Sequence, residues 1–98
     1  MDDFFVLAIL YAKEGKEQAL RADLMAVVEP SRNDAGNLRY ELFAQQDDPR
    51  RFVFVEHWAS AAEQERHHAE SAHIRQFQAS GIATVERVEL FYKLDRIA

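Results

Sequence analysis

The order in which hydrophobic periodicity changes along this chain limits its fold more than any other feature. Short runs in which apolar residues are continuous or alternate are typical of strands, and two longer stretches with helical spacing are typical of amphipathic helices. The few glycines and prolines separate these segments. The sequence therefore predicts, in order, a strand over 4–11, a helix after Gly15, strands over 38–44 and 52–58, a helix after Ser60, and a strand over 84–94.

The order β-α-β-β-α-β is that of the ferredoxin-like α+β fold, in which two helices lie on one face of a four-stranded antiparallel sheet. Pro30 is expected to end or kink the first helix near its C-terminus. Ser60 followed by Glu63 has the pattern of a capping box at the start of the second helix. The less regular apolar spacing of that helix predicts a break around residues 70–71.

The expected strands carry apolar side chains on both of their faces. Because the helices cover only one face, alternation predicts a polar second face in a monomer, and this sequence does not supply one. An uncovered apolar face of this kind would promote association or aggregation. We therefore expect a second copy of the chain to cover it, as a two-fold homodimer with an aromatic-lined ligand cavity. The adjacent apolar positions are Phe4–Leu7, Leu42–Phe43, Phe52–Val55 and Leu90–Tyr92.

Composition argues against several classes of function. Twelve Lys and Arg against seventeen Asp and Glu give a net charge of −5, which disfavours nucleic acid and anionic membrane surfaces. The chain has no cysteine, so disulfides and thiolate ligands are excluded. The acidic start, Met1–Asp3, is unlike a signal peptide, and no apolar run is long enough to span a membrane. We expect a cytoplasmic protein with one domain over residues 1–98.

Four stretches carry a family resemblance: Gly15–Glu17, Gly36–Leu42, Asp48–Trp58 and His68–Phe77. Together they resemble the antibiotic biosynthesis monooxygenase family, which includes quinol monooxygenases. The resemblance implies a dimeric α/β barrel with a pocket between the sheet and the helices of each subunit. It also implies oxidation of phenols or quinols by O₂, often without flavin or metal, although other members isomerise or only bind small molecules.

The last of these stretches resembles the family's His-x-x-Ser-x-His-hydrophobic-x-x-Phe signature and supplies the candidate base. Counting forward from Trp58 selects His67, and counting back from His73 selects His68. We favour His68, because the downstream signature is denser. A histidine titrates in the range needed to deprotonate a phenol or quinol, and the resulting anion can give an electron to O₂. The alternative is that His68 only caps or packs its helix.

Four other residues are predicted to bind substrate or to have a structural role. Trp58 either stacks on an aromatic substrate or belongs to the core. Tyr40 and Asn37 either bond a substrate hydroxyl or serve sheet packing and turn formation. His73 either lines the pocket or makes a structural hydrogen bond.

Glu56 lies between aromatic positions of the expected strand over 52–58. Desolvation there would raise the pKa of its carboxyl group and make it a second candidate base in the substrate site. The alternative, which we favour, is an ion pair with an arginine such as Arg39 or Arg87.

No cofactor is expected. His67 and His68 lie near Glu63, Glu65 and Glu70, but no His-x-x-x-His or His-Glu-x-x-His spacing is present, so we expect no metal site. A glycine-rich phosphate loop is also absent, so flavin and nucleotide binding have no motif to support them.

A haem-degrading branch shares the fold that the resemblance implies. That branch uses an Asn on the first strand, a Trp in the second helix and a downstream His as the iron ligand. The corresponding positions here are Ala8, His67 or His68, and the neighbourhood of Phe77. None of them matches, so haem degradation is not expected.

The sequence thus predicts a cofactor-independent monooxygenase that acts on a small aromatic quinol or polyphenol. His68 would accept the proton, and Trp58 and Tyr40 would position the ring. Two alternatives stay open. One is an isomerase or degrading enzyme for a small hydroxy-carbonyl compound, in which the same histidine moves a proton without O₂. The other is a non-catalytic, small-molecule-binding dimer module.

Overall fold

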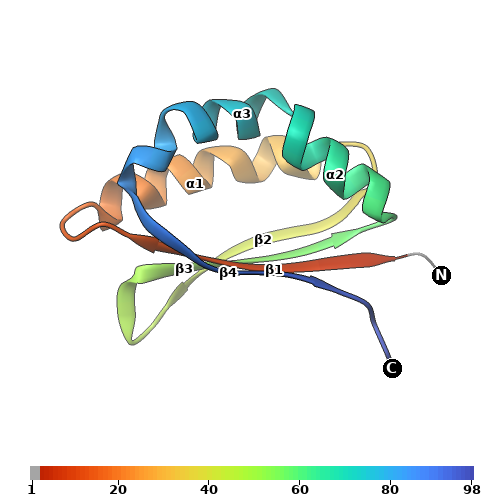
Figure 1. Cartoon of the computed structure of the whole chain (residues 1–98), viewed down its shortest axis with the longest axis horizontal. Coiled ribbons are helices and arrows are strands. Elements are labelled where there is room, and N and C mark those ends of the chain that lie inside the picture. The colour runs from red at the N-terminus through yellow and green to blue at the C-terminus, as the bar shows by residue number, and fades with distance from the viewer. Residues whose placement is uncertain (1–2) are drawn as a thin grey trace.

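The computed structural model describes residues 3–98, and Met1 and Asp2 of the acidic start lie outside the described residues. The ferredoxin-like α+β prediction is confirmed, with the second helix divided in two (Figure 1). The elements are β1 (Phe4–Ala12), α1 (Glu17–Arg32), β2 (Asn37–Gln45), β3 (Asp48–Trp58), α2 (Ala61–Glu70), α3 (Ala72–Ala79), the 3₁₀ turn η1 (Gly81–Thr84) and β4 (Val85–Leu94).

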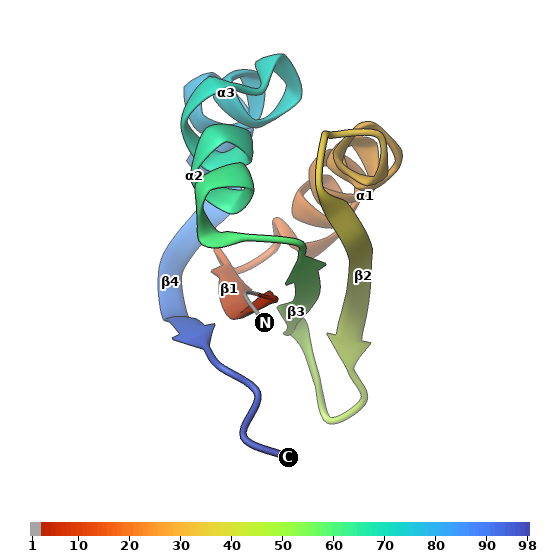
Figure 2. The same cartoon turned by 90° about the vertical axis from the view of Figure 1, so that its right-hand side faces the viewer.

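The four strands form one antiparallel sheet in the order β2-β3-β1-β4. All the helices lie on one face of this sheet, α1 over the β2 and β3 side and α2–α3 over the β4 side (Figure 2). The sheet is open within one chain, with β2 and β4 at its edges.

The core lies between the sheet and the helices. Side chains of β1 and the second half of β3 alternate between buried and partly exposed, as expected when one face packs against helices. Trp58 and Phe52 from β3 are almost completely buried, as are Leu20 and Leu24 from α1. The two leucines are one helical turn apart, which places both on the face of α1 that meets the sheet.

The helix termini follow the sequence with one exception. Glu63 donates its backbone N–H to the Ser60 side chain at 3.3 Å, which confirms the predicted N-cap of α2. Ser71 is extended and separates α2 from α3, which confirms the predicted break. The exception concerns Pro30, which was expected to end or kink the first helix near its C-terminus: α1 continues past Pro30 and ends two residues later, at Arg32. The Arg32 side chain donates to the Tyr40 carbonyl at 3.0 Å, and this tertiary contact holds the last turn.

The second face of the sheet is open in a single chain and carries large apolar side chains. Phe43, Tyr92 and Leu94 are 48%, 55% and 41% exposed. The register pairs Tyr92 with Leu7 and Leu94 with Phe5, so these four side chains share the face opposite the helices. The apolar second face predicted from the sequence is therefore present, and the homodimer that would cover it stays a prediction.

Within residues 3–98, no helix is long and apolar enough to cross a membrane.

Candidate functional site

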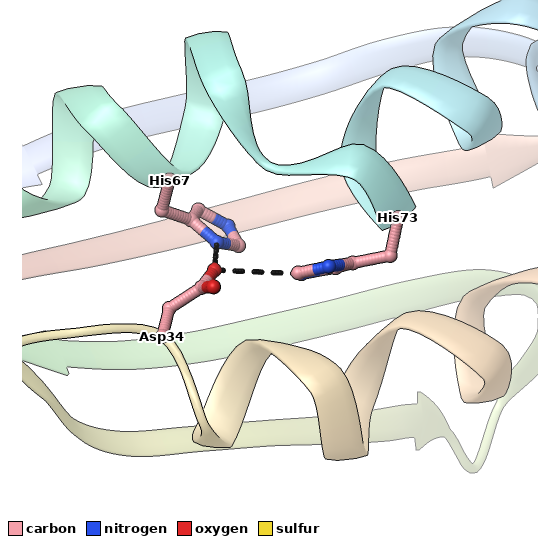
Figure 3. A group of neighbouring side chains, drawn as sticks. All are labelled: Asp34, His67 and His73. Carbon is pink, nitrogen blue, oxygen red and sulfur yellow. Dashed lines mark hydrogen bonds and ion pairs between the residues drawn. The ribbon is translucent and has the colours of Figure 1, made fainter.

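Polar side chains from three separate segments meet at one carboxylate oxygen, Asp34 Oδ2. His67 Nδ1 lies 2.7 Å from it, Ser71 Oγ donates to it at 2.8 Å, and His73 Nε2 lies 3.4 Å away. The Ser31 hydroxyl lies 3.0 Å from His73 Nε2. We call these five residues the Asp34 cluster. Figure 3 shows both imidazole rings, which come from α2 and α3, directed at the Asp34 carboxylate from the opposite side.

The break between α2 and α3 brings the two histidines of the cluster together. His67 and His73 are six positions apart, so in a continuous helix they would point about 120° away from each other. Ser71 interrupts the helix with extended backbone, at φ −67° and ψ 131°. The helix that follows, α3, therefore runs in a different direction from α2. Both rings therefore face the end of α1, where Ser31 and the turn containing Asp34 lie.

His67 is held in the core by aromatic rings. It is 4% exposed, and its ring centroid lies 4.7 Å from that of Trp58 and 5.4 Å from that of Tyr40. Burial lowers the pKa of His67 below its usual value, and the Asp34 carboxylate only partly opposes this. The ring is consequently neutral near pH 7. The tautomer that carries its proton on Nδ1 donates that proton to Asp34, and we assign it because it satisfies the carboxylate.

Glu56 is buried beneath this aromatic group. Trp58 donates its indole N–H to Glu56 Oε1 at 2.9 Å, and Glu56 is 5% exposed. Burial raises the pKa of Glu56 to about 7, although the hydrogen bond from Trp58 acts in the opposite direction. Burial, and then the Glu56 charge, also raise the pKa of Tyr40, so Tyr40 keeps its proton.

The expected ion pair between Glu56 and an arginine does not form. Arg39 lies opposite His57 in the sheet register, and Arg87 lies opposite Tyr11. Both arginines therefore lie on the second face of the sheet, whereas Glu56 points toward the helices. Each of these arginines instead pairs with a glutamate on its own strand.

His68 lies on a different side of α2 from His67. It is exposed, and its ring meets the Phe91 ring of β4 edge to face, with the centroids 5.6 Å apart. Phe91 pairs with the buried residue Ala8, so it is on the helix-covered face of the sheet. Consecutive histidines thus point apart, with His67 directed toward the end of α1 and His68 toward β4.

The predicted site residues therefore divide into separate groups. Trp58, Tyr40 and His73 surround His67, and the first two are almost completely buried. His68 is beside Phe91 instead. The remaining candidate, Asn37, donates its side-chain amide to the Arg39 carbonyl at 3.2 Å at the start of β2.

Sequence reasoning did not identify Asp34 as a site residue, although it is the centre of the cluster. It lies in a stretch with the composition of a turn, 33 positions before His67, and no spacing rule connects the two. Ser71 was part of the family signature, but its bond to Asp34 could not be inferred from that pattern. Asp34, His67 and His73 also offer three ligand atoms within 4.8 Å of one another, so they could hold a cation.

The open four-stranded sheet with its helices on one face defines a ferredoxin-like α+β protein. The chain belongs to the antibiotic biosynthesis monooxygenase family, whose sequence pattern matches residues 3–80. The resemblance stated from the sequence is therefore confirmed.

Individual relatives agree with this assignment. The chain is 31% identical over 74 residues to Putative monooxygenase YcnE of Bacillus subtilis (strain 168), covering 76% of this chain and 77% of the relative. The crystal structure of PA3566 from Pseudomonas aeruginosa superposes with a TM-score of 0.93 at 32% identity, covering 100% of this chain and 97% of the other. Protein SO0527 from Shewanella oneidensis gives a TM-score of 0.81 at 32% identity, covering 95% and 87%.

Proposed function

We propose that this protein is a monooxygenase that uses O₂ to hydroxylate a small aromatic quinol or polyphenol without a flavin. The family supports the reaction class, since its description is that of a monooxygenase. The observation that carries the proposal is the position of His68, an exposed imidazole whose ring contacts an aromatic residue on the helix-covered face of the sheet.

In this reaction the quinol supplies all the electrons that reduce O₂. His68 takes a proton from one hydroxyl, and the electron-rich anion gives an electron to O₂. One oxygen atom then replaces a ring hydrogen, the other leaves as water, and the product is the hydroxyquinone. One quinol and one O₂ thus give one hydroxyquinone and one water, and the reaction needs no external reductant.

The surroundings of His68 suit such a substrate. Phe91 offers a ring against which an aromatic substrate could pack. Lys93, two positions further along β4, pairs with Val6 and shares the same face of the sheet. An ammonium group on that face would stabilise the phenolate that His68 generates.

His68→Ala is expected to lower oxygen consumption at least about 100-fold, because loss of a general base typically costs two to four orders of magnitude. The measurement is O₂ uptake by chelator-treated protein with a panel of benzo- and naphthoquinols, with background autoxidation subtracted. Glu65→Ala is the matched control, since Glu65 is an exposed residue of the same helix. It should retain the wild-type rate.

Equal rates in the wild type and in His68→Ala would overturn the role of His68. Absence of uptake with every quinol would contradict the proposed substrate class and favour the isomerase or the binding module. Those two are then distinguished by whether a bound hydroxy-carbonyl compound is converted.

We also propose that the protein works as a homodimer in which a second copy covers the open face of the sheet. The exposed apolar side chains of Phe43 on β2 and of Tyr92 and Leu94 on β4 support this, because large apolar side chains exposed on one sheet face are typical of an interface. A two-fold axis would place the same patch on both partners.

Tyr92→Arg is expected to convert the dimer to monomers, because it places a charge on the apolar face, beside Leu7. Light scattering coupled to size-exclusion chromatography measures the mass. Met25→Arg is the control, since Met25 is 59% exposed on α1, away from the open face. A wild-type mass equal to one chain would contradict the proposal, as would an unchanged dimer in Tyr92→Arg.

A further inference from the structure

We infer that Asp34, His67 and His73 form a binding site for one divalent transition-metal ion in the groove between α1 and α2–α3. This inference does not depend on the proposed oxidation, because the residues belong to a different side of α2 from His68. Two imidazoles and one carboxylate are the donor set of many catalytic zinc sites and of non-haem iron sites, in which remaining positions are taken by water or substrate.

The spacing of the ligand atoms is close to what such an ion requires. Metal bonds of about 2.1 Å in a tetrahedral site separate neighbouring ligand atoms by about 3.4 Å. Asp34 Oδ2 is 3.4 Å from His73 Nε2 and 2.7 Å from His67 Nδ1, and all three atoms lie within 4.8 Å of one another. A small rotation of the Asp34 carboxylate lengthens the shorter separation.

The groups around these ligands would hold them in place. The Ser71 hydroxyl donates to Asp34 Oδ2. The Ser31 hydroxyl lies 3.0 Å from His73 Nε2, and the ion would replace it as the partner of that nitrogen. The rings of Trp58 and Tyr40 fix the orientation of His67. Such surrounding contacts commonly change metal affinity 10–100-fold, because they set the orientation of the ligands before the ion arrives.

An ion can also reach the site and complete its coordination there. A hollow of about 50 Å³ adjoins two of the three ligands, Asp34 and His67, and its other lining residues are Ala35, Glu63, Arg66 and Ser71. This volume is enough for a water molecule as a fourth ligand. The positive charge of Arg66 cancels the negative charge of Glu63. The remaining negative charge, that of the Asp34 carboxylate, favours a cation in this hollow.

No sequence motif predicted this site, and the expectation of no metal rested on the spacing of His67 and His68 with nearby glutamates. The histidines of the inferred site are six positions apart, and only the break at Ser71 brings both rings to the same carboxylate. Their carboxylate partner, Asp34, lies in the turn that follows α1, across from α2 and α3.

The test is a titration of chelator-treated, dialysed full-length protein with Co²⁺, followed by the visible ligand-field bands of bound Co²⁺. Saturation at one Co²⁺ per chain, reversed by Zn²⁺, is expected. His73→Ala removes one of the three ligands and should weaken Co²⁺ binding by more than the roughly 10–100-fold that is typical of losing a surrounding contact. The control is His57→Ala, because His57 Nε2 makes a similar 2.8 Å contact with Asp3 but has no second histidine beside it.

Thermal unfolding gives an independent readout. Zn²⁺ should raise the unfolding temperature of the wild type and of His57→Ala, and leave that of His73→Ala unchanged. His73→Gln replaces His73→Ala if the latter does not fold. Absence of Co²⁺ bands in the wild type, or equally tight binding by a folded His73 variant, would overturn the inference.

Discussion

Asp34→Ala is expected to destabilise the metal-stripped protein by about 2–4 kcal/mol. The substitution leaves the buried His67 Nδ1 without its 2.7 Å partner and removes the acceptor of the Ser71 hydroxyl. A buried polar group that loses its partner costs about 1–3 kcal/mol, and here two groups lose theirs. His73 keeps a neighbour in the Ser31 hydroxyl, so its contribution is smaller. Urea unfolding in the presence of a chelator measures the change.

Asp3→Ala is the matched control for that experiment. Asp3 and His57 are 2.8 Å apart, close to the separation of the buried pair, but the Asp3 side chain is 52% exposed. Water replaces the lost contact there, so the change should lie within the error of the measurement. Asp34→Asn should fall between the two, because its amide oxygen can still accept from His67. A similar, small loss for Asp34→Ala and Asp3→Ala would contradict the structural role of the Asp34 cluster.

Glu56→Gln is expected to remove a pH dependence of stability that amounts to about 3 kcal/mol in the wild type. The folded-state pKa is raised from 4.5 to about 7 by burial. Between these values the unfolded chain has released the proton of Glu56 and the folded chain still holds it. The contribution of Glu56 to the free energy of unfolding therefore falls as the pH rises through this window, and levels off above it. His67, whose pKa is lowered by burial, contributes with the opposite sign in both proteins, so Glu56 is isolated by the difference between the two profiles.

The variant carries a neutral amide whose oxygen can still accept from Trp58 at every pH. We expect Glu56→Gln to be more stable than the wild type at about pH 8.5 and similar to it at about pH 5. Denaturant unfolding across this range measures both profiles. Glu41→Gln is the control, since Glu41 lies on the second face of the sheet and pairs with Arg39. A stability difference between Glu56→Gln and the wild type that stays constant across the window would show that the Glu56 pKa is not raised.

The fold could be predicted because its signals are local. Gly and Pro mark the turns, apolar spacing separates strands from helices, and Ser60 with Glu63 marks a helix start. The end of α1 could not be predicted in this way. Pro30 is compatible with a last helical turn when a tertiary contact holds it, and the bond from Arg32 to the Tyr40 carbonyl does so.

The candidate site was less predictable because its contacts are long-range. Two readings of the histidine spacing were possible, and each histidine lies in a different environment: His67 is buried in the Asp34 cluster and His68 contacts Phe91. Asp34 reaches His67 only after both helices pack on the sheet. Glu56 was expected to find an arginine, but the side-chain alternation of the sheet sends Arg39 and Arg87 to the other face.

The most direct test of the proposed activity is the fate of the oxygen atoms of O₂. Chelator-treated protein would be supplied with a quinol under ¹⁸O₂, and the product and peroxide analysed by mass spectrometry and a peroxidase assay. The expected product is a hydroxyquinone with one ¹⁸O atom, formed without hydrogen peroxide, and its formation should be lost in His68→Ala. An unlabelled quinone formed with hydrogen peroxide would contradict it, because the protein would then remove electrons from the quinol without inserting oxygen.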